Sequence, residues 1–144
     1  DALLRDGVLE EVALPGSPRR YLVPSGFRAR PVVQPDDRMR ILGPLDPLLW
    51  DRALVKHVFG FEYAWEVYKP AEQRRWGWYV CPLLHRGALV GRLEARVRDG
   101  VLQVDNLWRE KGVKLDDGAL DEALGRHARA CGAVKVKRPK ARVG

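Results

Sequence analysis

The stretch that most constrains the fold is Trp76–Val97, because two apolar runs meet there at one tight turn, Arg86-Gly87. In the second run, Leu89–Val97, inward positions alternate with outward ones, which is the period of a β-strand. The side chains expected to point into water are Val90, Arg92, Glu94 and Arg96. The first run, Trp76–Leu84, is apolar on both faces and rich in aromatic residues, as a central strand is. The stretch therefore predicts a β-hairpin.

The neighbouring segments extend this hairpin into a sheet. Asp99-Gly100 is a strong signal for a second hairpin turn, because both positions tolerate a positive φ, and it predicts a third strand at Val101–Trp108. Glu62–Tyr68 predicts a fourth strand before the hairpin. In it one set of alternating residues is Tyr63, Trp65 and Val67, and the other is Glu62, Ala64 and Glu66. Four consecutive strands form a meander that curls into a barrel or packs on a helix.

Two helices are expected beside this sheet. Arg52–Phe59 has Asp51 as its N-cap and Gly60 after its end. The second helix, Asp116–Gly132, has acidic residues at its start and arginines near its end, as the helix dipole favours. Its apolar stripe at helical spacing is Leu120, Ala123, Leu124, His127, Ala128 and Cys131. The predicted fold is α+β, a small antiparallel β-sheet or barrel with two helices.

The N-terminal segment has a different pattern. Asp1–Arg5 looks like the end of a helix, and two short strands follow at Val8–Leu14 and Arg19–Val23. A helix followed by a hairpin with a basic tip is typical of the second half of a winged helix. In that case Arg19 and Arg20 lie where a wing meets a phosphate backbone or a minor groove. The alternative is a plain hairpin that caps the sheet.

These segments divide the chain into three parts. Residues 1–25 are the predicted wing hairpin of a truncated winged helix, and residues 26–40 are a linker that contains Pro31 and Pro35. Residues 41–144 are the barrel-like domain with its C-terminal helix. Because the chain begins without Met on what looks like the end of a helix, we expect it to be a piece of a longer protein.

Composition restricts the class of protein. The 144 residues are 46% hydrophobic and 31% charged, as in a globular protein with a core. No stretch approaches a membrane span and no signal peptide is visible, so we expect a cytoplasmic protein without a membrane partner. Cys81 and Cys131 are expected to be reduced core residues. The lack of CxxC or HxxxH spacing predicts no metal site, and no cofactor is expected.

A net charge of +7 permits binding to a polyanion. The segment Lys135–Gly144 holds five basic residues and no acid, so Lys135, Lys137 and Arg138 are candidates for phosphate contact; the alternative is a solvated tail. A second basic segment carries Arg74 and Arg75 next to Trp76, Trp78 and Tyr79. Such residues can grip a backbone and stack on a base. Alternatively, the tryptophans are core and the arginine stems cover them.

No catalytic constellation is visible in these residues. The chain has no Gly-rich phosphate loop and no nucleophile elbow, and the carboxylates lie on strand faces, caps or turns. Glu62, Glu66 and Glu94 have no base, nucleophile or metal ligand at a telling spacing. We therefore predict no catalytic residue in this chain.

Three segments resemble the C-terminal half of the YcaQ/AlkZ family of winged-helix DNA-repair proteins. They are LGPLDPLLWDR at Leu42–Arg52, FGFEYAWEVYKPAEQRRWGWYVCPLL at Phe59–Leu84 and ALVGRLEARV at Ala88–Val97. The pattern is long and ordered, and it covers roughly residues 42–108. The resemblance implies tandem winged helices followed by a β-barrel in the whole protein, of which this chain would be the last wing and the barrel.

The resemblance also implies a function. Members of the family are bacterial DNA glycosylases that hydrolyse the N-glycosidic bond of bulky or crosslinked alkylated purines, so the implied partner is double-stranded DNA. The family's catalytic Gln-x-Gln or Gln-x-Asp motif lies in the first winged helix. Gln34-Pro35-Asp36 matches that spelling, but it lies in the predicted linker and we reject it. The alternative function is a non-enzymatic winged-helix DNA-binding or interaction module, since fold alone does not assign a role.

Overall fold

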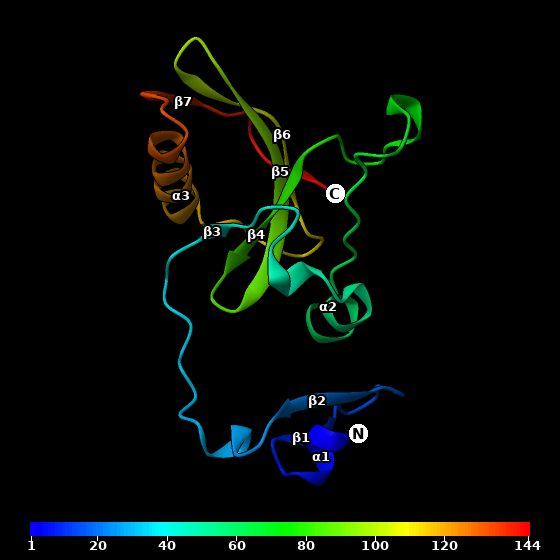
Figure 1. Ribbon diagram of the computed structural model, residues 1–144. Coiled ribbons are helices and arrows are strands. Elements are labelled where there is room, and N and C mark those ends of the chain that lie inside the picture. The colour runs from blue at the N-terminus through cyan, green and yellow to red at the C-terminus, as the bar shows by residue number, and fades with distance from the viewer. The chain divides into compact units, whose positions relative to one another are not determined.

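The computed structural model describes residues 1–144 and confirms a mixed α+β fold. The chain separates into two compact units, Asp1–Gln34 and Pro35–Gly144. The first unit contains a short helix and a two-stranded sheet, and the second contains two longer helices and a six-stranded sheet (Figure 1).

The first unit is the predicted hairpin with a helical turn before it. Helix α1 (Ala2–Arg5) leads into β1 (Leu9–Ala13), which pairs antiparallel with β2 (Arg20–Pro24). A 3-10 turn at Phe27–Ala29 follows. No residue of this unit is buried. The hairpin is confirmed, while its identity as the wing of a winged helix remains a prediction.

The second unit is built on a sheet with strand order β3-β4-β5-β6-β7, and β8 also pairs with β6. The strand bounds are β3 Arg40–Ile41, β4 Val80–His85, β5 Ala88–Arg98, β6 Val101–Arg109, β7 Lys135–Lys137 and β8 Arg142–Val143. Both predicted hairpin turns are present, because Arg86 and Gly87 have φ of 50° and 78° and Asp99 and Gly100 have φ of 48° and 71°. Two consecutive positive φ values define the turn that matches the twist of paired strands.

The prediction of an antiparallel sheet is wrong at one edge. β7 and β8 both pair parallel to β6, because the chain crosses over through helix α3 (Asp117–Ala130) before it returns to the sheet. The basic C-terminal segment is therefore not a frayed tail, since strand pairing holds it at both positions.

The predicted strand at Glu62–Tyr68 is also wrong. These residues form no strand pairing. The side chain of Tyr63 is buried, as is that of Phe61 just before the segment, and the Tyr63 hydroxyl donates to the Val80 carbonyl at 2.9 Å. An alternating sequence pattern indicates which side chains are buried, but it does not show that a partner strand is present. Similarly, the strand predicted from Trp76 begins only at Val80.

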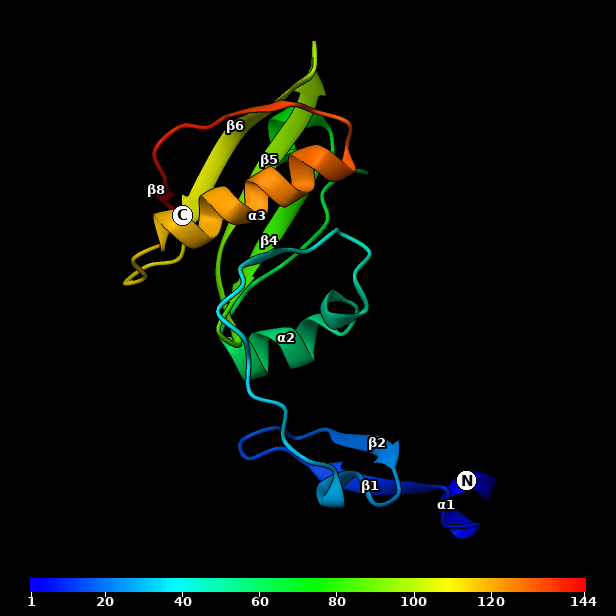
Figure 2. The same ribbon diagram turned by 90° about the vertical axis from the view of Figure 1, so that its left-hand side faces the viewer.

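The second unit contains two separate apolar clusters of buried residues. The first joins Leu83, Leu93 and Leu102 of the sheet to Leu120 and Leu124 of α3, and Figure 2 shows α3 lying across β4–β6. The second cluster joins helix α2 (Arg52–Phe59) to the segments before and after it and to the start of β5. Its buried members are Leu42, Leu49, Val55, Phe61, Tyr63 and Leu89.

Helix α2 (Arg52–Phe59) and helix α3 confirm the two predicted helices and their caps. The Asp51 carboxylate accepts from the Leu54 amide, and the Asp116 carboxylate accepts from the Ala119 amide, both at 2.9 Å. Cys81 is buried, but Cys131 is exposed at the C-cap of α3, so the predicted core position of Cys131 is wrong.

The simple alternation expected along β5 does not hold. The register shifts once against β4, between Leu83 and Leu84, and once against β6, after Glu94. Each bulge adds one residue to a strand and turns the following side chains to the other face. Arg92 is 2% exposed instead of pointing into water, because Phe61 and Trp76 cover its face of the strand, and Val97 is 43% exposed.

Candidate nucleic-acid interface

The structure distributes the predicted DNA-contacting residues over three separate places. The hairpin of the first unit carries Arg19 and Arg20, the segment before β4 carries Arg74 and Arg75, and the β7 edge carries Lys135, Lys137 and Arg138. The first of these places lies in a different unit from the other two.

On the hairpin, both arginines follow the turn that enters β2. The Arg19 amide donates to the Ser17 hydroxyl at 3.2 Å, which shapes the turn. The Arg20 guanidinium lies 3.7 Å from the Glu11 carboxylate across the hairpin, and both side chains are more than half exposed. An exposed pair of this kind contributes little to stability, so Arg20 is accessible to a phosphate.

The segment before β4 is held by carboxylates instead of by a strand. Glu66 accepts from the Trp76 amide at 2.9 Å and from the Lys69 ammonium at 2.8 Å. Glu94 of β5 accepts from the Trp78 amide at 2.8 Å and from the Tyr79 amide at 3.3 Å. Charge-assisted bonds to backbone amides are strong, so residues 76–79 have a fixed conformation although they lie outside the sheet.

Trp76 itself is packed between cations. The Arg75 guanidinium lies 4.6 Å and the Arg92 guanidinium 4.2 Å from its ring centroid, and the Trp108 ring meets it edge-on at 5.3 Å. These distances are typical of cation–π contacts. Guanidinium groups therefore lie over Trp76, and a DNA contact by Arg75 stays a prediction.

Arg92 is the residue that the sequence pattern misplaced most clearly. It lies 4.1 Å from the Phe61 centroid and donates to the Glu62 carbonyl at 3.0 Å and to the Glu110 carboxylate at 2.9 Å. Burial lowers the pKa of Arg92, and the hydrogen bond that Arg92 donates to Glu110 opposes that effect. The guanidinium thus bridges the β5 strand to the segment that follows α2.

Trp78 and Tyr79 behave differently from Trp76, because both remain on the surface. Their side chains border a hollow of about 560 Å3, which Arg74 and Arg96 also line. The Arg74 Nε donates to the Lys69 carbonyl at 2.8 Å, and Arg96 pairs with Asp105. Sequence reasoning placed Arg74 here but missed Arg96, whose spacing indicated only a solvent-facing strand position.

At the β7 edge, the three predicted cations are not equivalent. Lys135 and Lys137 are exposed. Arg138 donates to Asp121 at 2.6 Å and to Asp117 at 2.8 Å, and the bond to Asp121 is the main cause of its raised pKa. Arg138 therefore ties the C-terminal segment to α3, and its charge is already matched by two carboxylates.

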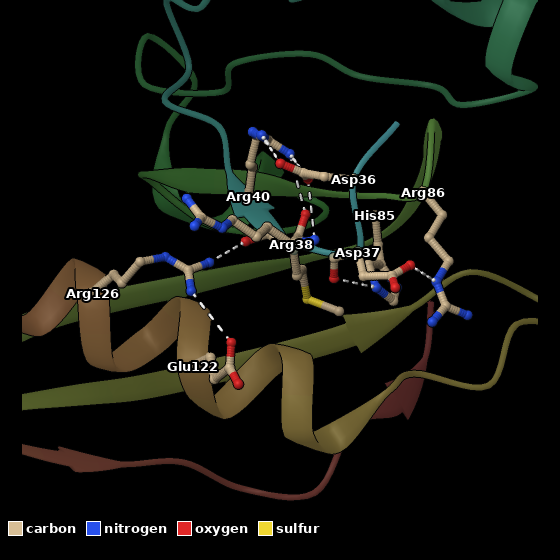
Figure 3. Close-up of polar contacts among 9 residues, drawn as sticks. Asp36, Asp37, Arg38, Arg40, His85, Arg86, Glu122 and Arg126 are labelled. Atoms are coloured by element: carbon tan, nitrogen blue, oxygen red, sulfur yellow. Dashed lines mark hydrogen bonds and ion pairs between the residues drawn. The ribbon is translucent and has the colours of Figure 1, made fainter. Parts of the chain in front are cut away.

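A further polar cluster, outside the three places with predicted DNA-contacting residues, lies where the chain enters the second unit (Figure 3). Arg40 donates to both oxygens of Asp36, at 2.7 Å and 2.8 Å, and this contact lowers the pKa of Asp36 to about 2. Arg86 donates to Asp37 at 2.8 Å, and a ring nitrogen of His85 lies 3.1 Å from the Asp37 carbonyl. The end of the predicted linker is thus fastened to the β4–β5 hairpin.

The same cluster reaches α3 through Arg126. Its guanidinium donates to the Met39 carbonyl at 2.7 Å and lies 3.7 Å from Glu122 one turn earlier (Figure 3). Arg40, Arg86 and Arg126 are therefore engaged with acids or a carbonyl. This arrangement fits a structural tie better than a phosphate site.

Glu62 and Glu66 both have a lowered pKa. Lys56 lowers the pKa of Glu62. Burial would raise the pKa of Glu66, but bonds from Lys69 and Trp76 outweigh it and the pKa is lowered. A general acid at neutral pH needs a raised pKa. No group of three or more His, Cys, Asp or Glu side chains is placed to hold a metal ion.

Comparison with known proteins adds the family. A sequence model described as "DNA glycosylase AlkZ-like" matches residues 1–130. Among solved structures, the chain is similar to the Streptomyces sahachiroi DNA glycosylase AlkZ, with 18% sequence identity and a TM-score of 0.49. That match covers 92% of this chain and 34% of the other, so this chain spans about a third of the length of that protein. In the chain described here, no helix has the length and apolar character needed to cross a membrane.

Proposed function

This chain belongs to the AlkZ-like DNA glycosylase family, and from that membership we propose that it is the DNA-contacting C-terminal part of a repair glycosylase. The observation that carries the proposal is the family match over residues 1–130, and the net charge of +7 is consistent with a polyanionic partner. The proposed partner is double-stranded DNA, in the cytoplasm of a bacterial cell. The proposed reaction of the whole protein is hydrolysis of the glycosidic bond of alkylated or crosslinked purines.

Within that protein we assign contact and support to this chain, and no catalytic step. Arg19, Arg20, Lys135 and Lys137 are exposed and can neutralise phosphates. The lowered pKa values of Glu62 and Glu66 support the lack of a catalytic acid in the second unit. The reacting water is proposed to be positioned by the glutamine motif of a first winged helix, which this chain does not contain.

The test is binding of the 144-residue chain to a fluorescein-labelled duplex across a salt series, followed by fluorescence anisotropy. Each phosphate contact steepens the slope of log affinity against log salt by about 0.9. The double variant Arg19→Glu, Arg20→Glu is therefore expected to bind more weakly and to show a slope shallower by about 2.

The matched control reverses two exposed lysines elsewhere, Lys111→Glu and Lys114→Glu, and so has the same net charge. It is expected to keep the slope of the original chain. If both variants change the slope equally, only net charge matters and the hairpin makes no contact. If the original chain does not bind duplex DNA even at low salt, the proposal fails.

A further inference from the structure

We propose that four aromatic side chains of the second unit form a stacking surface for unpaired DNA bases. They are Tyr68, Trp65, Tyr79 and Trp78, and we call them the aromatic row. The inference rests on the proposed function, because it takes DNA as the partner. It adds a binding site and the state of the DNA that this site would recognise.

The rings of the aromatic row form one continuous chain of contacts. Trp65 meets Tyr68 at 6.1 Å and Tyr79 at 6.2 Å between ring centroids, with interplanar angles of 62° and 88°. Trp78 continues the row, at 6.3 Å from Tyr79. Trp65 is the partly buried anchor, and the other three rings are supported from beneath or beside by a neighbour.

The exposed area of these rings is unusual for side chains of this type. Tyr68 is 91% exposed, Trp78 55% and Tyr79 44%. A contiguous group of exposed aromatic rings on a folded domain marks an interaction surface more often than a single exposed residue does. Tyrosine and tryptophan are also the side chains that lose little conformational entropy when they bind.

The backbone beneath the aromatic row is already ordered. Glu94 accepts from the amides of Trp78 and Tyr79, and Glu66 accepts from the amide of Trp76. The hydroxyl of Tyr63 holds the Val80 carbonyl at the point where β4 begins. Because these bonds form within the chain, a ligand would meet rings that need little rearrangement, which favours binding.

Charge distinguishes nucleic acid from an apolar protein segment as the occupant. Arg74 shares a hollow of about 560 Å3 with Trp78 and Tyr79, and its Nε alone is bonded, to the Lys69 carbonyl. Arg96 lines the same hollow but is paired with Asp105, so Arg74 is the cation offered to a phosphate. Glu94 also lines the hollow, but its carboxylate accepts from the amides of Trp78 and Tyr79, and Glu66 is paired with Lys69. Rings flanked by arginines are the combination that single-stranded nucleic acid recognises, with stacking on the rings and phosphate contact at the cations.

Unpaired bases are the part of DNA that fits. In an intact duplex the flat faces of the bases are covered by their neighbours, and only edges and phosphates are accessible. A protein ring can stack on a base only where the strand is single or the duplex has opened. The aromatic row would therefore contact DNA beside an opened or unpaired position. The cations of the hairpin and of the β7 edge, in contrast, would need only the phosphate backbone of the DNA.

The experiment compares two fluorescein-labelled probes of equal length and charge, oligothymidine and the same backbone without bases. Binding of the 144-residue chain is measured by anisotropy, and quenching of tryptophan fluorescence is followed in parallel. We expect oligothymidine to bind about tenfold or more tightly than the abasic probe, and Trp78→Ala and Tyr68→Ala each to remove most of that difference. Trp78→Phe should retain it, because a phenyl ring still stacks.

The control variant is Trp50→Ala. Trp50 is 72% exposed, but it contacts no other aromatic ring, and its indole N–H donates to the Leu45 carbonyl. It should bind both probes as the original chain does. Thermal unfolding of each variant tests whether the fold is retained, and we expect an unchanged Tm because the replaced side chains are exposed.

Two results would overturn the inference. One is equal affinity for the two probes, and the other is a Trp78→Ala chain that binds oligothymidine as tightly as the original while Trp50→Ala does too. Either result with salt-dependent duplex binding intact would leave the proposed function standing. Loss of binding to every probe, duplex included, would instead contradict the proposed function itself.

Discussion

At the scale of single residues, charged side chains organise the second unit from within. Arg92 lies between two aromatic rings in the interior, while Glu66 and Glu94 replace missing strand partners for residues 76–79. Buried or half-buried charges are costly unless they are paired, and each of these has a partner. The exposed rings of Trp78 and Tyr79 in the aromatic row depend on Glu94 for their position.

Glu66 provides a residue-scale prediction about pH. Its lowered pKa means that the folded state favours the carboxylate, so its stabilising effect is present above its ordinary pKa of 4.5 and is lost as pH falls through the lower, folded-state pKa. Glu66→Gln should lower the free energy of unfolding by about 1–3 kcal/mol at neutral pH, because Lys69 and the Trp76 amide lose a charged acceptor.

Thermal unfolding from neutral pH down to about pH 3 measures this effect. The Tm of the variant and that of the original chain should converge as pH falls. Glu72→Gln, which changes an exposed glutamate nearby, should show no such convergence. A Tm difference for Glu66→Gln that stays constant over this range would show that its carboxylate charge does not contribute.

At the scale of elements, the register shifts of β5 against its neighbours affect which apolar cluster each of its buried side chains joins. The bulge against β4 lies between Leu89 and Leu93, so Leu89 belongs to the α2 cluster and Leu93 to the α3 cluster, although the two residues are four apart on one strand. Between them β5 passes very close to β6 at Gly91. A Cβ atom on that residue would lie 2.3 Å from the Trp108 carbonyl oxygen.

Gly91→Ala is therefore expected to destabilise the chain. The contact is with backbone, which cannot move aside as a flexible side chain would, so the strands must separate locally at a cost of about 1–3 kcal/mol. Urea unfolding followed by circular dichroism measures the difference. Gly43→Ala is the matched control, because nothing lies within 4 Å of the added methyl group, and it should change little. Equal stability of both variants would contradict the close approach.

At the scale of the whole molecule, the two units differ in how they are stabilised. Every buried residue of both apolar clusters lies in the second unit, and the first has no buried residue. The first unit therefore offers surface and charge and has no buried core of its own.

Removal of residues 1–34 should then leave residues 35–144 with a single cooperative unfolding transition at an unchanged Tm. Differential scanning calorimetry of the full and shortened chains gives the comparison. The shortened chain lacks Arg19 and Arg20, so its duplex affinity should fall below that of the full chain. A shortened chain that unfolds without a cooperative transition would show that the core depends on the hairpin.

Local signals were sufficient for most elements. Arg86-Gly87 and Asp99-Gly100 predicted their turns because the backbone conformation required there is a property of the residues themselves. Asp51 and Asp116 predicted their helix starts for the same reason, since a cap bonds an amide three residues away. The sequence also predicted Arg74 and Arg75 as part of an aromatic and basic segment.

What the sequence could not decide depends on contacts between distant residues. Glu62–Tyr68 alternates like a strand but packs without a ladder, Arg92 is enclosed although its position in the pattern faces water, and Cys131 is exposed although it continues an apolar stripe. The aromatic row was visible in the sequence only as scattered tyrosines and tryptophans. Its members became one surface because Glu94, from a different strand, holds Trp78 and Tyr79 beside Trp65. Local residue chemistry determined the turns and caps of this protein, whereas tertiary packing decided which faces are buried and which rings meet, because both depend on residues that only the fold brings together.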